Sequence, residues 1–150
     1  MKYIAIIMTV LMLLITHAQA KDSIPLQYED VIKQYKGDVI YLDFWASWCT
    51  PCRKSFPWMN AMQKKYADKN FKVISVNLDA KSSLSKQFLL DTPADFTVLY
   101  DPKGNLAAEL KLKGMPSSFI INSEGKVVSA HMGFTEKKKI KYEQEIQQLL

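Results

Sequence analysis

Cys49 and Cys52 are the two cysteines of this 150-residue chain, and only two residues separate them. The apolar run 39–45 precedes them and an amphipathic pattern follows, which predicts a buried strand leading into a helix with the Cys-x-x-Cys at the junction. The first helical turn has N–H groups without intrahelical partners and is the positive end of the helix dipole, so a thiolate is stabilised there. Such sites lower the pKa of a cysteine from about 8.5 to between ~3.5 and ~7.5.

This placement predicts different roles for the two sulfurs. Cys49 occupies the cap position and is expected to be the exposed nucleophile. Cys52 lies three residues later on the same helix face and is expected to be more buried. Pro51 suits the first helical turn, because its missing N–H is not needed there. The pair is therefore suited to thiol–disulfide exchange, in which one sulfur attacks a partner's disulfide and the other resolves the mixed disulfide.

Other uses of a cysteine pair are weighed against this one. A structural disulfide stays open as an alternative, although a loop this short contributes little chain-entropy stabilisation. A zinc site needs roughly four ligands, and His17 and His131 are far from the cysteines in sequence. Attachment of haem requires a histidine directly after the second cysteine, where this chain has Arg53.

The segment Asp-Phe-Trp-Ala-Ser-Trp-Cys-Thr-Pro-Cys, residues 43–52, resembles the active-site segment of thioredoxins. Its Thr-Pro pair and the later Gly-Met-Pro-Ser-Ser-Phe-Ile-Ile-Asn resemble the TlpA/ResA-like branch of extracytoplasmic thiol–disulfide oxidoreductases, over about residues 26–150. The resemblance implies an α/β fold, a thioredoxin-like three-layer sandwich with a mixed central sheet and helices on both faces. It also implies that residues 82–112 hold the extra helix and strand of that branch, and that no metal or organic cofactor is required.

The resemblance further assigns the residues around the cysteines. It implies that Trp48, Thr50 and Pro51 form part of the substrate-binding face. Met115 and Pro116 are implied to complete that face through a cis peptide opposite the cysteine pair. The backbone N–H and C=O of Met115 would then be available to a substrate segment that pairs as an added strand.

Asp43 is the anomalous residue of the predicted strand. A carboxylate among apolar neighbours is costly to bury, and desolvation is expected to raise its pKa. Such a group in a functional cleft is a candidate acid or base. The resemblance implies that Asp43 relays a proton to and from Cys52. Thioredoxins often have a lysine where this chain has Ser75, so Asp43 is expected to lack a cationic neighbour. A hydrated carboxylate at the strand end, without a catalytic role, is the alternative.

Hydrophobic periodicity and turn residues predict the remaining elements. Helices are expected over 26–35, 50–69, 82–90, 106–112 and from Thr135 onward, and strands over 39–45, 71–78, 96–100, 117–121 and 126–132. Ser82 or Ser83 is predicted to cap the third helix. The last helix is predicted to bury four residues: Ile140, Ile146, Leu149 and Leu150. The turn at 123–126 predicts an antiparallel hairpin, so the sheet is expected to be mixed with helices on both faces.

The N-terminal pattern predicts export. Lys2 precedes an apolar run over 4–15, and Ala18-Gln19-Ala20 offers the small residues of a cleavage site. We therefore expect a signal peptide over 1–20 and a thioredoxin-like domain over 21–150, located in the bacterial periplasm or secreted. The apolar run is shorter than the ~20 residues of a membrane span. An uncleaved membrane anchor is the alternative.

The composition bounds the choice of partners. The net charge is +5, and much of the excess lies in Lys137–Lys139 and Lys141, which we expect to form a solvated helix face. A nucleic-acid partner is not expected, because no recognised binding fold or set of base-stacking aromatics accompanies these lysines. By resemblance, the partners are cysteine-containing exported proteins, such as apocytochrome c in cytochrome c biogenesis, and a membrane-bound electron donor. The protein is expected to act as a monomeric reductant.

Two rival functions remain at this stage. The first is a thioredoxin-fold module whose two thiols hold a copper ion, as in some extracytoplasmic copper chaperones. Such modules usually add a histidine or methionines, and His131 is the only histidine after residue 20. The second is a purely structural exported domain. Metal content after purification separates the copper module from an oxidoreductase.

Overall fold

The computed structural model describes residues 25–150, so the predicted signal peptide lies outside the described residues. Five strands form one mixed sheet in the order β3-β2-β1-β4-β5. The strands are β1 (Val39–Trp45), β2 (Phe71–Asn77), β3 (Thr97–Tyr100), β4 (Ser117–Ile121) and β5 (Val127–Met132). The first three are parallel, whereas β4 is antiparallel to β1 and β5 is antiparallel to β4. The predicted strands and the predicted hairpin are thereby confirmed.

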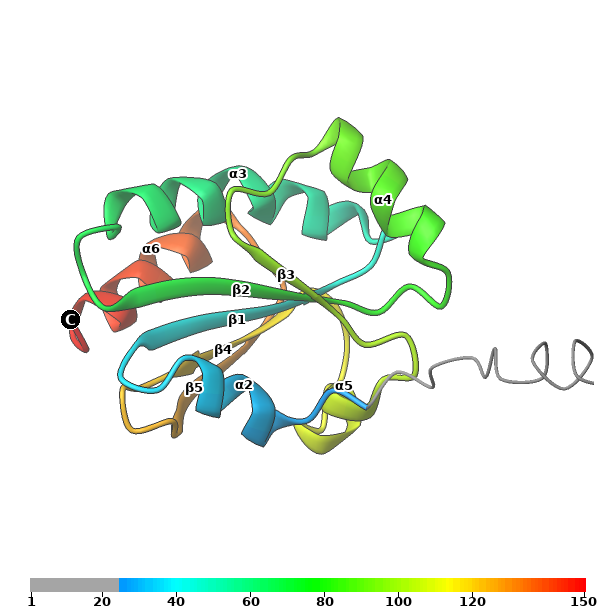
Figure 1. Cartoon of the computed structure of the whole chain (residues 1–150). Coiled ribbons are helices and arrows are strands. Elements are labelled where there is room, and N and C mark those ends of the chain that lie inside the picture. The colour runs from blue at the N-terminus through cyan, green and yellow to red at the C-terminus, as the bar shows by residue number, and fades with distance from the viewer. Residues whose placement is uncertain (1–24) are drawn as a thin grey trace, which may run out of the picture.

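Helices cover both faces of the sheet (Figure 1). On one face lie α3 (Thr50–Lys65), α4 (Ser82–Asp91) and α6 (Glu136–Gln147), and on the other lie α2 (Tyr28–Gln34) and α5 (Asn105–Glu109). Each layer has its own buried cluster, centred on Trp45 and Phe56 in the first and on Leu42 and Leu106 in the second. The predicted three-layer α/β class is confirmed. None of the helices within residues 25–150 has the length and apolar character needed to cross a membrane.

Strand β1 is the centre of the sheet and is buried at every position. It lies between β2 and β4 and is covered on both faces, which explains its almost continuous apolar sequence. Successive side chains of a strand point to opposite faces. Tyr41 and Trp45 belong to the cluster under α3 and α6, so Asp43, which lies between them, faces the same layer.

Helix α3 follows the predicted pattern closely. Phe56, Met59 and Met62 are buried against the sheet, so the two methionines are core residues. Tyr66 is also buried but follows the last helical residue, so the helix is shorter than the predicted range. Pro57 lies inside the helix.

Two predictions about helix ends and faces are wrong. The N-cap of α4 is Lys81 rather than a serine, because the helix already begins at Ser82. In α6, Ile140 is exposed, and Tyr142 takes the buried position one turn before Ile146. Residues four apart share a helix face, whereas a residue two positions away lies on the other side. Leu149 and Leu150 lie beyond the end of α6 and are also partly exposed.

Candidate functional site: a cysteine pair at the end of the central strand

Cys49 and Cys52 form a disulfide at the junction of β1 and α3. Cys49 is the N-cap of α3, as predicted, and Pro51 lies in the first turn. The backbone N–H of Cys52 donates a hydrogen bond to Sγ of Cys49 at 3.3 Å. The same N–H also donates to the carbonyl of Cys49 at 3.1 Å, so it is shared between the carbonyl and the sulfur of the N-cap residue. An N–H group of the first helical turn is therefore directed at the first sulfur, and this arrangement stabilises a thiolate at this position.

The two sulfurs differ little in burial in this disulfide form. Cys49 is 4% exposed and Cys52 is 0% exposed, so the predicted order is correct, but the expectation that Cys49 is exposed is wrong. The Cys49 sulfur is bonded to Cys52 and turned back onto the helix N-terminus, so it joins the buried cluster. Around the pair, Trp48 is 70% exposed, and Thr50 and Pro51 are exposed as well.

A hydrogen-bond network that the sequence analysis missed holds the loop before the cysteines. The carboxylate of Asp79 accepts hydrogen bonds from the backbone N–H and hydroxyl of Ser47, at 3.0 and 2.9 Å, and from the amide of Asn77 at 2.8 Å. The backbone N–H of Leu78 also donates to the carbonyl of Trp45. A signal was present, because Asn77 is the last residue of a parallel strand next to β1 and Asp79 comes two residues later.

The Met115–Pro116 segment lies at the same end of the sheet as the cysteines. Phe44, near the end of β1, pairs with Ser117 at the start of β4, directly after this segment. The Met115–Pro116 peptide bond is cis, as the resemblance implies. Met115 is half-buried and packs against the cluster that contains both cysteines. The carbonyl of Pro116 accepts the N–H of Gly133 at 2.7 Å, which anchors the segment to β5.

Asp43 is 1% exposed, and its Oδ2 has no hydrogen-bond partner among the described residues. Burial raises the pKa of Asp43 well above the ordinary 3.8, as predicted. Its cross-strand neighbours are Ser75 on β2 and Ser118 on β4, both uncharged, so no cation at the expected lysine position offsets the desolvation. Burial, with a smaller contribution from Asp43, also raises the pKa of Tyr142 to about 12.

His131 belongs to a separate contact at the edge of this layer. Its ring stacks on Tyr142 with centroids 4.2 Å apart, and Nε2 lies 2.7 Å from Glu145. These contacts make it a packed histidine. Within residues 25–150, no group of three or more His, Cys, Asp or Glu side chains is placed to hold a metal ion.

The sheet order, the helices on both faces and the disulfide at a helix N-terminus define a thioredoxin-like protein. The family model described as Redoxin matches residues 26–148, so the chain belongs to the redoxin family. Among curated relatives, the thiol-disulfide oxidoreductase ResA of Bacillus thuringiensis subsp. konkukian is 31% identical over 109 residues. That match covers 73% of this chain and 63% of the relative, so the chain spans less than two thirds of the relative's length.

Solved structures agree with the fold and with the TlpA/ResA-like resemblance. A Chlorobium tepidum structure described as a thiol:disulfide interchange protein, DsbE, is 52% identical, with a TM-score of 0.77 over 79% of this chain and 84% of that one. The pneumococcal exposed lipoprotein thioredoxin Etrx1 of Streptococcus pneumoniae is 31% identical, with a TM-score of 0.68 over 79% of this chain and 90% of that one.

Proposed function

We propose that the protein is an exported thiol–disulfide oxidoreductase that reduces disulfides of other proteins through Cys49 and Cys52. The observation that carries the proposal is the disulfide at the start of α3, where the N–H of Cys52 is directed at the Cys49 sulfur. The names of the ResA and DsbE relatives, which refer to thiol–disulfide chemistry, support it.

The proposed reaction starts from the dithiol form. The Cys49 thiolate attacks one sulfur of the partner's disulfide, and the partner's other sulfur leaves as a thiolate. The Cys52 thiolate then attacks Sγ of Cys49, forms the disulfide seen here and releases the partner's first sulfur. Two electrons pass from the cysteine pair to the partner, which takes up two protons overall. A dithiol protein must supply two electrons to restore the starting form.

Asp43 is proposed to move the proton of Cys52. It faces the layer that contains both cysteines, and a buried carboxyl with a raised pKa can accept or return a proton near neutral pH. The exposed side chains of Trp48, Thr50 and Pro51, with Met115 and Pro116 at the same end of the sheet, are proposed to form the substrate-binding face. A substrate segment would pair with the backbone of Met115.

We also propose a location and partners. The predicted signal peptide supports export to the periplasm or the cell exterior, and one structural relative is itself described as an exposed lipoprotein. Substrates would be exported proteins with cysteines, apocytochrome c among them, and a membrane-bound dithiol protein would return the electrons. The copper-holding alternative is separated from this proposal by the metal content of the purified protein.

A trapping experiment tests the proposed reaction. Cys52→Ser removes the resolving sulfur and leaves Cys49 able to attack, so the partner stays attached through Cys49. Expressed with its own N-terminus, this variant is expected to accumulate adducts with other exported proteins that disappear on reduction. Non-reducing gels followed by mass spectrometry of the adducts measure this outcome.

The control is Cys49→Ser, which should accumulate few adducts because Cys52 is fully buried. The proposal is wrong if the Cys52→Ser variant runs only as a monomer and the wild type purifies with copper bound. The copper-holding module would then be the better assignment. The reduction potential, measured against glutathione, decides whether the pair acts as a reductant or as an oxidant.

A further inference from the structure

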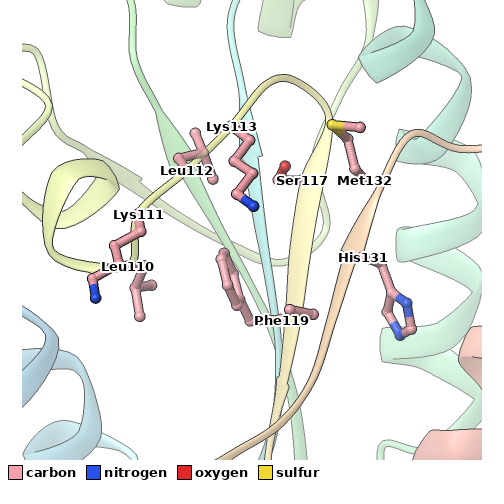
Figure 2. A pocket seen from close by; sticks show the side chains of 9 residues that line it. Leu110, Lys111, Leu112, Lys113, Ser117, Phe119, His131 and Met132 are labelled. Carbon is pink, nitrogen blue, oxygen red and sulfur yellow. The ribbon is translucent and has the colours of Figure 1, made fainter.

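A groove with a volume of about 380 Å³ lies on the α5 side of the sheet, beside the Met115 segment (Figure 2). The loop after α5 forms one wall, and strands β4 and β5 form the floor and the opposite wall. Its lining residues are Leu110, Lys111, Leu112, Lys113, Ser117, Phe119, Ala130, His131 and Met132. Neither Cys49 nor Cys52 lines this groove, so it is distinct from the disulfide itself.

The groove has a largely buried floor on β4 and an exposed apolar wall on β5. Phe119 pairs with Ala130, and Ser117 pairs with Met132, so these four side chains share one face of the hairpin. Ala130 is exposed and Met132 is 58% exposed, and both apolar side chains are on β5, the edge strand of the sheet. Figure 2 shows the His131 side chain directed the other way, toward the helices. Exposed apolar surface on a sheet edge is characteristic of a site for another polypeptide.

The rim of the groove is positively charged. Lys111 and Lys113 are both exposed, and no carboxylate is among the lining residues. Neither lysine takes part in the ion pairs found within residues 25–150. Figure 2 shows Lys113 extending from the loop into the space above Phe119. An occupant that complements this site has apolar side chains and negative charge.

Lys111 occupies a position that favours glycine. Helix α5 ends at Glu109 with Leu110 as its C-cap, and Lys111 follows with a positive φ of 54°. The N–H of Lys111 bonds to the carbonyl of Ala108, and the N–H of Leu112 bonds to that of Ala107. These two bonds form a Schellman motif, in which the left-handed residue is usually glycine because a Cβ is unfavourable there. A lysine is therefore held at the groove rim in a conformation that favours another residue, which is the pattern of a functional position.

We propose that this groove binds an acidic, apolar stretch of the substrate polypeptide that adjoins the cysteine attacked by Cys49. The inference rests on the proposed function and adds a substrate preference to it. Lys113 precedes Met115 by two residues, and a Cβ atom added at Gly114 would lie 3.4 Å from Sδ of Met132. A strand paired at Met115 thus enters the groove directly. A strand advances about 3.3 Å per residue. The acidic residue of the substrate is therefore expected roughly two to four residues from its cysteine.

The test uses peptides with one cysteine blocked as a mixed disulfide with 2-mercaptoethanol. Three peptides are compared, and they differ only in the residues two to four positions from the cysteine. The acidic peptide has Glu and Leu there, the neutral peptide has Gln and Leu, and the basic peptide has Lys and Leu. The reduced full-length protein should react with the acidic peptide about three- to tenfold faster than with the basic one, as expected for one or two exposed charge pairs. The ratio should shrink as salt is added, because these charges are screened.

Three variants sharpen this test. Lys111→Glu with Lys113→Glu should reverse the peptide preference, whereas Lys137→Glu on α6 changes the net charge away from the groove and should leave it unchanged. Lys111→Gly removes one charge and supplies the residue that the Schellman motif favours. It should lose part of the preference while its melting temperature stays equal to or rises above that of the wild type. A loss of preference therefore cannot be attributed to unfolding.

Reaction with neutral hydroxyethyl disulfide separates the two proposals. If the protein reduces neither this compound nor any peptide, the proposed function fails. If it reduces all substrates without a charge preference, only the groove assignment is overturned. The proposal is also overturned if the wild type sediments as a dimer, the Lys111→Glu/Lys113→Glu variant sediments as a monomer and the two have the same peptide selectivity. These results would assign the groove to a second copy of the chain.

Discussion

Asp43, within β1, and Asp79, just past the end of β2, are two buried carboxyl groups with opposite surroundings. Asp43 is 1% exposed and Asp79 is 4% exposed, so burial does not distinguish them. The carboxylate of Asp79 accepts hydrogen bonds from Ser47 and Asn77, whereas Oδ2 of Asp43 has no partner among the described residues. A buried polar group is normally satisfied, and an exception calls for a functional explanation. Asp79 therefore holds the loop, and the unpartnered oxygen of Asp43 supports the proposal that this residue takes part in the chemistry.

The positions of the two residues explain the difference. Asp43 lies within the central strand β1, where neighbouring backbone groups are already used by the β2 and β4 ladders. Asp79 lies just past the end of β2, where the loop of Ser47 offers donors that no strand uses. Strand ends thus supply partners for a buried charge, whereas a strand centre does not.

The largest effect is expected when Asp43 is changed to asparagine and turnover is measured. Without the proposed proton carrier, release of the partner from the mixed disulfide should slow by roughly a hundredfold near neutral pH, the lower end of what a positioned acid–base group contributes. The deficit should narrow at higher pH, because the Cys52 thiolate then forms without a base. Single-turnover kinetics from about pH 6 to pH 9 measure it, a range that spans thiol titration. Identical profiles for variant and wild type would remove Asp43 from the chemistry.

The next effect concerns the folding role assigned to Asp79. Asp79→Ala leaves the backbone N–H of Ser47 and the amide of Asn77 without their acceptor, which should cost about 2 kcal/mol of unfolding free energy. Turnover of the folded fraction should fall only a few-fold. Urea denaturation measures the stability loss, and Asp79→Asn, which keeps one acceptor oxygen, should lose less. A stable Asp79→Ala protein with abolished turnover would show that the two carboxyls have been assigned the wrong roles.

The smallest effect is on the pH dependence of stability. Because burial raises the folded-state pKa of Asp43, its contribution to stability is complete below the ordinary value of 3.8 and is lost as pH rises through the folded value. Asp43→Asn cannot ionise, so it should be more stable than the wild type near neutral pH by about 1 kcal/mol and should lack this decline.

Measurements of this pH effect belong on the disulfide form, in which neither cysteine titrates. Parallel stability curves for Asp43→Asn and the wild type across the acid and neutral range would mean that the Asp43 carboxyl is hydrated rather than desolvated. That result would weaken the contrast with Asp79 more directly than a kinetic result, because it addresses the surroundings of the group itself.

Local sequence was sufficient for the central strand, the helix after it and the cap at Cys49. The run 39–45 is apolar because β1 is covered on both faces, and Phe56, Met59 and Met62 recur at helical spacing because one side of α3 packs on the sheet. The cysteine spacing places both sulfurs at the helix start. These features depend on contacts within a few residues or on periodicity, so they can be derived from the chain before any tertiary contact is known.

The tertiary structure alone decided which distant residues meet. Ser47 and Asp79 are 32 positions apart, and their hydrogen bonds exist only because β1 and β2 are parallel neighbours. The low exposure of Cys49 depends on where its sulfur packs, and the groove requires the α5 loop to lie beside a hairpin distant in sequence. A periodic pattern indicates which face of an element is buried but not which element covers it. The stabilising interaction depends on side chains from both segments, so neither segment alone predicts the pairing.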